Sequence, residues 1–338
     1  MIKNKSITWI TWADHRRTSE IAAELNAELI VVNSAGPIWA KHLARSLKTI
    51  SILRAKKDNV IIVQNPSRIL AAIATLFSFF WGYPLLVDRH TNFRLGKKVS
   101  FDPRIWFLIL CSNFSIRYAD LTIVTNEFLK DLVERKGGRG FVLPDKIPFL
   151  HSDGLCDENI KGSDGRERVV FICTFADDEP YGSVIEAGNL LDRKIQIFIT
   201  GNYKSQPKFA ADDLPSNVKF TGFLPDSDYT KLLSSADVVI DFTSLEWCLV
   251  CGGYEALSLN KPLVTSNTQA LIEYFEDSAI FSTHSPVAIA HAINKAIDFK
   301  EDLKQKSAQL KQKKEEEWRR QFKSLVKFID QSGKPPIQ

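Results

Sequence analysis

The segment Asp241–Ser266, DFTSLEWCLVCGGYEALSLNKPLVTS, has the residue types expected where a protein binds a phosphorylated ligand. It reads as a strand end, a loop, a helix whose N-terminus lies at Cys251, Gly252 and Gly253, and a second buried strand. Glycines let a backbone approach a ligand closely, and the N–H groups of a helix N-terminus attract anions. Glu255, expected in the first turn of this helix, could accept hydrogen bonds from two adjacent hydroxyls, as on a ribose. The alternative is a plain acidic residue favoured by the helix dipole.

The first half of the chain offers a candidate at the end of another predicted strand. Tyr83–Thr91 is a strand that runs into a loop, and open α/β sheets bind ligands at the carboxyl ends of their strands. His90 lies in this loop, and Asp88 and Arg89 next to it would set its orientation and charge. The competing interpretation is a solvent-exposed loop histidine.

A cationic loop, WADHRRT, follows the first predicted strand. Arg16 and Arg17 could grip a phosphate through paired hydrogen bonds. Equally, they could belong to the charged first turn of a helix that Thr18 caps.

Two further motifs have spacings found at metal sites. Cys248 and Cys251 are three residues apart, but no second cysteine pair or histidine pair accompanies them. Asp226 and Asp228 follow a Leu-Pro pair and precede a predicted helix, so we interpret them as an N-terminal cap. We therefore expect no metal ion. The sequence also contains no P-loop or nucleophile elbow, and it lacks the pattern of a nucleic-acid-binding module.

Short apolar runs alternate with helical patterns along most of the chain, which is typical of βαβ units and parallel sheets. In the first half we expect strands at Ser6–Thr11, Leu29–Asn33, Val60–Gln64, Leu85–Arg89 and Leu121–Thr125, and helices at Thr18–Leu25, Ile38–Lys48, Ile69–Trp81 and Glu127–Arg135. In the second half we expect strands at Val169–Cys173, Ile195–Thr200, Val218–Thr221, Val238–Phe242, Pro262–Ser266 and Ala279–Phe281, and helices at Ser183–Leu191, Ser227–Ser235, Gly253–Leu259, Thr268–Phe275 and Pro286–Asp298.

The polar segment His151–Arg168 interrupts this alternation and reads as a linker. The predicted fold class is therefore α/β, with two doubly wound, Rossmann-like domains that face a cleft, and a charged helix at the C-terminus. We expect the first domain at 1–155, the second at 165–300, and a charged helix and tail at 301–338 that packs back on the first domain.

Charge is divided unevenly between the predicted domains. Residues 1–150 carry 22 Lys and Arg against 12 Asp and Glu, whereas residues 151–298 carry 11 against 22. A basic domain favours phosphates or an anionic membrane surface. The uncharged run Ile69–Val87 is weighed as a membrane span, but Gly82 and Pro84 interrupt it. A buried helix followed by a strand is preferred, with interfacial membrane contact second. The five cysteines and the N-terminal sequence suit a cytoplasmic protein without a signal peptide.

The second half resembles the C-terminal domain of retaining GT-B glycosyltransferases, of the family 4 or "glycosyl transferases group 1" type. The resemblance rests on matching pieces in the family's order: Gly222-Phe223, Tyr229, Leu232-Leu233, Ala236-Asp237-Val238 and Tyr254–Val264. It implies that Glu255 binds the ribose of a nucleotide and that His90 lies beside the transferred sugar.

The sequence departs from the family pattern in two places. The family's second glutamate, eight residues before the first, corresponds to Trp247, and Glu246 would need a one-residue bulge to contact the donor sugar. The Arg-Lys pair that the family uses on the donor diphosphate is absent, because the first loop of the second half is acidic. Lys204 is the nearest basic substitute.

The resemblance implies transfer of a sugar from a nucleoside-diphosphate sugar, with retention of configuration and no cofactor or metal. The second domain would hold the donor, with the leaving diphosphate at Cys251–Gly253, and the first domain the acceptor. The basic first half suggests a lipid-linked or polysaccharide acceptor of bacterial-type cell-surface glycan synthesis, reached from the cytoplasm at an anionic membrane surface. Two alternatives stay open. One is a non-catalytic GT-B subunit that binds a lipid or a partner enzyme, and the other is a nucleotide-sugar 2-epimerase.

Overall fold

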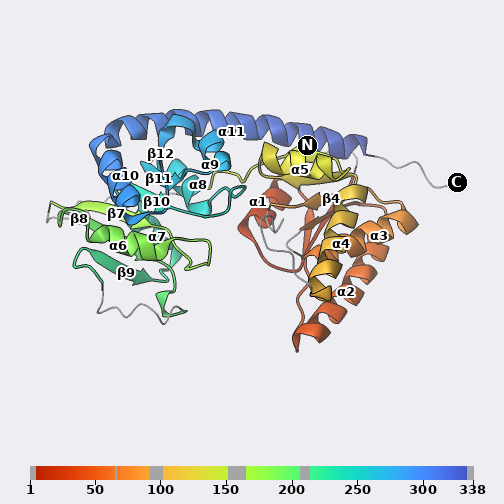
Figure 1. Cartoon of the computed structure of the whole chain (residues 1–338). Helices are drawn as coiled ribbons and strands as arrows, with labels where there is room; N and C mark the ends of the chain where they lie inside the picture. The colour runs from red at the N-terminus through yellow and green to blue at the C-terminus, as the bar shows by residue number, and fades with distance from the viewer. Residues whose placement is uncertain (1–4, 65–66, 91–101, 151–164, 206–213, 333–338) are drawn as a thin grey trace. The chain divides into compact units, whose positions relative to one another are not determined.

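The computed structural model describes residues 5–64, 67–90, 102–150, 165–205 and 214–332. The chain divides into two compact units, one of Met1–Lys146 with Glu317–Gln338 and one of Ile147–Glu316. Each unit holds a six-stranded sheet in which the described strands pair in parallel (Figure 1). The predicted fold class, two Rossmann-like α/β domains, is confirmed. Most of the predicted linker, 151–164, lies outside the described residues.

The first unit is built from alternating strands and helices. Its elements are β1 (Ile7–Thr11), α1 (Arg16–Glu24), β2 (Glu28–Val31), α2 (Ile38–Ala55), β3 (Val60–Gln64), α3 (Arg68–Trp81), β4 (Leu85–Asp88), α4 (Pro103–Tyr118), β5 (Leu121–Val124), α5 (Glu127–Arg135) and β6 (Gly140–Val142). The strand order is β2-β1-β3-β4-β5-β6. Ligands of doubly wound sheets bind where the strand order reverses, which here is between β1 and β3.

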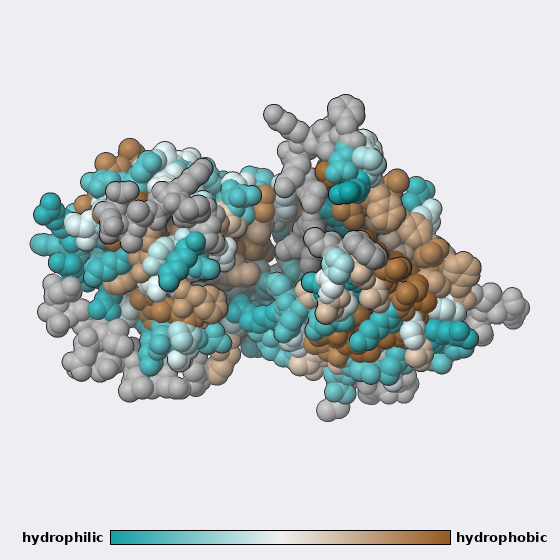
Figure 2. Space-filling view, turned by 90° about the horizontal axis from the view of Figure 1, so that it is seen from below, coloured by the Kyte–Doolittle hydropathy of each residue, from teal (hydrophilic) through white to brown (hydrophobic). Residues whose placement is uncertain are grey.

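Apolar side chains alternate along these strands and fill both faces of the sheet, because successive strand residues point to opposite sides. Trp9 and Ile62 pack under α1 and the end of the long helix α11 (Lys300–Gln331). Ile61 and Val63 pack under α2 and α3. Helices α2, α3 and α4 lie side by side, α3 packing against both neighbours (Figure 1). Figure 2 shows apolar surface on the unit that contains these helices, at the right of the view.

The second unit repeats the architecture. Its elements are β7 (Glu167–Phe171), α6 (Tyr181–Gly188), β8 (Ile195–Thr200), the 3-10 turn η1 (Tyr203–Ser205), β9 (Val218–Gly222), α7 (Asp226–Ser235), β10 (Val238–Asp241), α8 (Cys251–Ser258), β11 (Leu263–Ser266), α9 (Gln269–Phe275), the 3-10 turn η3 (Glu276–Ser278), β12 (Ala279–Ser282), α10 (Pro286–Asp298) and the first part of α11.

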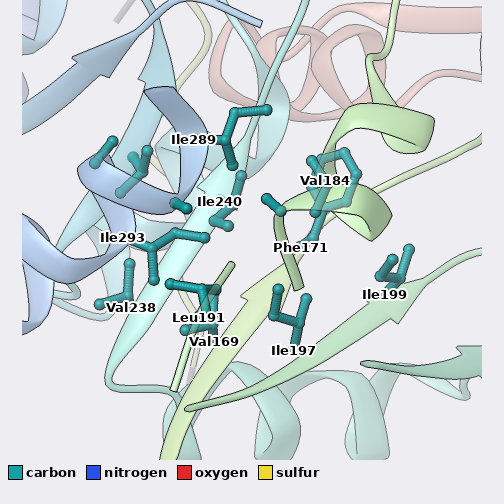
Figure 3. Packing of buried hydrophobic residues seen from close by; sticks show 14 of the residues in the cluster. Val169, Phe171, Val184, Leu191, Ile197, Ile199, Val238, Ile240, Ile289 and Ile293 are labelled. Atoms are coloured by element: carbon teal, nitrogen blue, oxygen red, sulfur yellow. The ribbon is translucent and has the colours of Figure 1, made fainter. Parts of the chain in front are cut away.

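The strand order of the second unit, β12-β11-β10-β7-β8-β9, reverses between β7 and β10. Val169 and Phe171 of β7 point into the core beneath α6 and α10 (Figure 3). Val170 points to the opposite face, which α7, α8 and α9 cover. The loops after β7 and β10 therefore lie at the edge of the sheet where proteins with this topology bind their ligands.

Several element predictions need correction. Helix α4 and strand β6 were not predicted, and α2 runs seven residues beyond Lys48, to Ala55. Asp226 and Asp228 do not cap α7; they lie in its first turn, after Pro225, without a side-chain cap. Thr18 does not cap α1, which begins at Arg16. The run Ile69–Val87 forms α3 and β4, and within the described residues no helix is long and apolar enough to cross a membrane.

Candidate functional site

The glycines at the start of α8 serve close packing within the protein. A Cβ on Gly252 would lie 2.5 Å from Asp241 Oδ2 and 2.5 Å from Ile172 Cδ1, and one on Gly253 would lie 2.5 Å from Phe275 Cζ. The sequence predicted that these glycines admit a ligand, and that role stays a prediction. Their first requirement is the approach of α8 to β10 and α9.

The N–H groups at this helix N-terminus are directed to a carboxylate of the chain itself. Asp241, the last residue of β10, is buried, and the backbone N–H groups of Gly252 and Gly253 lie near enough to its carboxylate to affect its pKa. Burial raises the pKa of Asp241 well above its usual value; Glu179 and Glu255 raise it further, and the two N–H groups lower it. A diphosphate placed here would have to share or replace these donors.

Glu255 lies two residues further into α8 than in the predicted helix Gly253–Leu259, because α8 begins at Cys251. Since α8 begins at Cys251, Glu255 is its fifth residue and lies outside the first turn, where the helix dipole acts most strongly. The dipole explanation therefore loses its basis. Glu255 is only 8% exposed, and its Oε2 accepts a 2.5 Å hydrogen bond from the hydroxyl of Tyr229 on α7. Tyr229 fixes the carboxylate at the end of the sheet.

The acidic loop after β7 is folded around one of its own carboxylates. Glu179 accepts hydrogen bonds from the backbone N–H groups of Thr174 and Ala176, both at 2.9 Å, and from the Thr174 hydroxyl. Phe175, between them, has a positive φ of 61°, a strained conformation for a bulky residue. Asp178 accepts a 2.6 Å hydrogen bond from Thr243 and so joins this loop to the loop after β10.

Three other predicted site residues lie around this edge of the second unit. Glu246 is exposed and accepts a 2.6 Å hydrogen bond from the N–H of Gln269, which ties its loop to the start of α9. Cys251, the first residue of α8, is exposed. Lys204 lies in η1 after β8, also exposed. Their roles toward a donor stay predictions.

A buried ion pair organises the first unit's candidate residues. Arg17 on α1 donates to both carboxylate oxygens of Asp88, at 2.9 to 3.2 Å, and also to Asp145 and to the carbonyl of Leu143. Burial alone would raise the pKa of Asp88, but Arg17 holds it well below its usual value. The sequence assigned the guanidinium N–H groups of Arg17 to a phosphate, but in the structure they donate to Asp88, Asp145 and the Leu143 carbonyl. The structure gives Arg17 the task of holding Asp88.

His90 is held by the same carboxylate. Its Nδ1 lies 3.0 Å from Asp88 Oδ2, and its side chain is 5% exposed, so it is no solvent-exposed loop histidine. Because Asp88 stays ionised, it can only accept a hydrogen bond, and the proton must lie on Nδ1 of His90. Nε2 is then the atom that can exchange a proton with a ligand.

His15, which the sequence analysis missed, completes this group. Its ring lies 4.7 Å from that of His90, and its Nδ1 is buried without a hydrogen-bond partner among the described residues. Burial lowers the pKa of His15, and His90 lowers it further. Its position in the cationic loop after β1 was the available signal. Arg16 is half-exposed and lies 3.7 Å from Glu20.

Arg89 points away from this group. It is fully buried and donates to the hydroxyls of Ser112 and Ser115 on α4. Asp88 and Arg89 therefore act on opposite sides of the sheet, as neighbouring residues at a strand end do. Among the described residues, the His90 ring is hydrogen-bonded to Asp88, whereas the sequence had assigned its orientation to both Asp88 and Arg89.

The family model "Glycosyl transferases group 1" matches residues 158–316, which include β7 to α10 and Glu255. No curated protein gives a significant sequence match to the chain.

Solved structures match the chain over nearly its whole length. HepE of Anabaena, in complex with UDP and glucose, has a TM-score of 0.67 and 16% identity over 97% of this chain and 98% of its own. Sucrose-phosphate synthase of Thermosynechococcus elongatus has a TM-score of 0.75 and 13% identity over 97% and 99%. A UDP-N-acetylglucosamine 2-epimerase has a TM-score of 0.59 and 11% identity over 91% of both chains. The chain thus has the GT-B fold of glycosyltransferases, and its second half matches the group 1 model.

Proposed function

We propose that this protein is a glycosyltransferase that moves a sugar from a nucleoside-diphosphate sugar to an acceptor hydroxyl, with retention of configuration and without a metal ion. The observation that supports this most is Glu255, a nearly buried carboxylate within the segment that matches the family model. Tyr229 holds it by a hydrogen bond, and α8, which carries it, follows β10, one of the two strands between which the strand order reverses. HepE, of the same fold, binds UDP-glucose, and we extend donor binding of that kind to the second unit of this chain.

Glu255 would recognise the ribose of the donor. An ionised carboxylate has two oxygens that can accept hydrogen bonds from two adjacent hydroxyls, and the hydrogen bond from Tyr229 to Oε2 fixes how this carboxylate is oriented. Hydrogen bonds to charged groups contribute about 1.5 to 3 kcal/mol each. Loss of this carboxylate should therefore weaken nucleotide binding about tenfold or more.

The proposed diphosphate position, at Cys251–Gly253, is unusual for a transferase because the neighbouring loop after β7 is acidic. The loop after β7 carries Asp177, Asp178 and Glu179, all acidic. Two properties reduce their repulsion of a diphosphate: the Glu179 carboxylate is turned into its own loop, and the raised pKa of Asp241 favours the neutral form. Lys204 is the proposed cation for the diphosphate.

In the first unit, His90 is proposed to act at the transferred sugar or the acceptor hydroxyl through Nε2, with Asp88 and Arg17 as positioning residues. The acceptor is proposed to be lipid-linked or a polysaccharide of the cell envelope, met on the cytoplasmic side at an anionic membrane. The basic character of residues 1–150 supports this.

Two other functions are each favoured by one observation. A non-catalytic subunit with this fold is favoured by the missing Arg-Lys pair. An epimerase is favoured by the fold likeness to UDP-N-acetylglucosamine 2-epimerase, and would convert a UDP-sugar without any acceptor.

Nucleotide binding is the first test. We expect UDP, GDP or ADP to raise the melting temperature, and one sugar in a panel of nucleotide sugars to be hydrolysed slowly. Glu255→Ala should weaken nucleotide binding about tenfold. Glu273→Ala, an exposed carboxylate on α9, should leave it unchanged. If no nucleotide stabilises the protein, the transferase proposal is wrong.

A further inference from the structure

The outer faces of α3 and α4 carry a group of exposed apolar side chains. On α3 these are Leu76, Phe79 and Phe80, and on α4 they are Trp106, Phe107, Leu110 and Tyr118. The spacing of three, four and eight residues puts each set on one side of its helix, and α3 packs against α4. With Leu43 and Leu47 of α2, nine of the sixteen large apolar side chains exposed among the described residues lie on these helices.

Neighbouring rings in this face hold one another in place. Phe79 lies 5.7 Å from Tyr118 and 6.3 Å from Phe114, and Phe114 lies 5.3 Å from Tyr118, between ring centroids. Arg117 lies over the Tyr118 ring at 5.7 Å. An ordered, contiguous apolar patch of this kind marks a docking surface rather than scattered surface residues.

The charge of the three helices decides what docks there. Helices α2, α3 and α4 contain seven basic residues and no acidic residue. The nearest carboxylates in sequence, Asp58, Asp102 and Asp120, lie beyond the helix ends. Lys48, Arg54, Arg104 and Arg117 are exposed, and none of them is within ion-pair distance of a carboxylate among the described residues. The partner should therefore be apolar and anionic.

We infer that the α3–α4 face, with the exposed edge of α2, inserts into the interface of a membrane that contains anionic lipids. The apolar side chains enter the acyl boundary while the basic residues meet lipid phosphates. Trp106 and Tyr118 are the aromatic types that concentrate at that depth. A second copy of the chain fits less well, because a two-fold contact would place this unpaired basic surface against itself. The inference rests on the proposed function for the membrane-bound acceptor and adds the surface of the first unit that contacts the membrane.

Vesicle sedimentation of the full chain tests the inference. We expect binding to phosphatidylcholine vesicles with about one third phosphatidylglycerol, at least tenfold weaker binding to pure phosphatidylcholine, and loss of binding at about 0.5 M salt. Phe80→Ser with Leu110→Ser, 69% and 64% exposed, should weaken binding at least tenfold. Val287→Ser with Phe299→Ser, 69% and 55% exposed in the second unit, should not.

Charge variants separate the basic contribution. Lys48→Glu with Arg117→Glu should weaken binding to the anionic vesicles at least tenfold, whereas Arg193→Glu with Lys219→Glu in the second unit should not. Absence of vesicle binding, or equal binding by Phe80→Ser with Leu110→Ser, would overturn the inference. So would a dimer in analytical ultracentrifugation that these two substitutions dissociate. Nucleotide binding, measured on the same variants, tests the transferase proposal separately.

Discussion

Replacement of Arg17 by Met should destabilise the first unit strongly. Methionine keeps most of the length and apolar volume of the side chain but removes the cation. The Arg17 and Asp88 side chains are 1% and 0% exposed, so the carboxylate would stay buried without the guanidinium that holds both of its oxygens. Removal of one partner of a buried pair costs about 3 to 5 kcal/mol of unfolding free energy.

Urea unfolding followed by tryptophan fluorescence measures this loss of stability in the first unit. Of the seven tryptophans, only Trp247 belongs to the second unit; Trp9 and Trp12 lie in the cores that flank the first sheet. Arg16→Met is the matched control. Its half-exposed side chain lies 3.7 Å from Glu20, and such surface pairs contribute about 0.2 to 1 kcal/mol.

The loss should depend on pH. In the wild-type protein the pKa of Asp88 lies below its unfolded value, so its contribution to stability is complete above the unfolded pKa and is lost as pH falls through the folded pKa. In Arg17→Met the uncompensated burial should raise the pKa of Asp88, and the variant gains stability as pH falls. The difference between the two proteins should narrow from about pH 7 to pH 4.

A second substitution checks that the buried charge causes the effect. Asp88→Asn combined with Arg17→Met leaves no charge at the site and should recover part of the loss. If Arg17→Met costs no more than Arg16→Met, or if the double variant recovers nothing, the ion pair does not organise this unit.

Three further predictions concern single residues. Asp241→Asn should stabilise the second unit in calorimetry, and the gain should grow as pH rises above about 4, because a carboxyl with a raised folded pKa loses stability as it ionises; the exposed Asp298→Asn should give no such trend. Tyr229→Phe should weaken nucleotide binding by about three- to tenfold, and unchanged affinity would remove Tyr229 as the positioning residue of Glu255. His90→Ala should lower donor turnover about 100-fold or more while nucleotide affinity changes little; an equal loss of both would assign His90 to binding.

The pattern of apolar residues predicted most of the fold because strand alternation and helix spacing are local properties. Val60–Gln64 and Ile195–Thr200, for example, are strands with the bounds predicted. Helix α4 was not predicted because its sequence lacks the usual alternation of an apolar and a polar face. One side packs on α3, and the exposed side is also apolar, with Trp106, Phe107 and Leu110.

The sequence alone determined which side chains lie at the ends of the strands: His90 after β4 and Glu255 after β10. Only the tertiary structure decided their partners. Arg17 meets Asp88 and Asp145 across 71 and 128 residues of sequence, and Tyr229 meets Glu255 across 26. Parallel crossovers bring strand ends that are distant in sequence to one edge of a sheet. No local sequence pattern could therefore show that Arg17, predicted to bind a phosphate, pairs with a buried carboxylate instead.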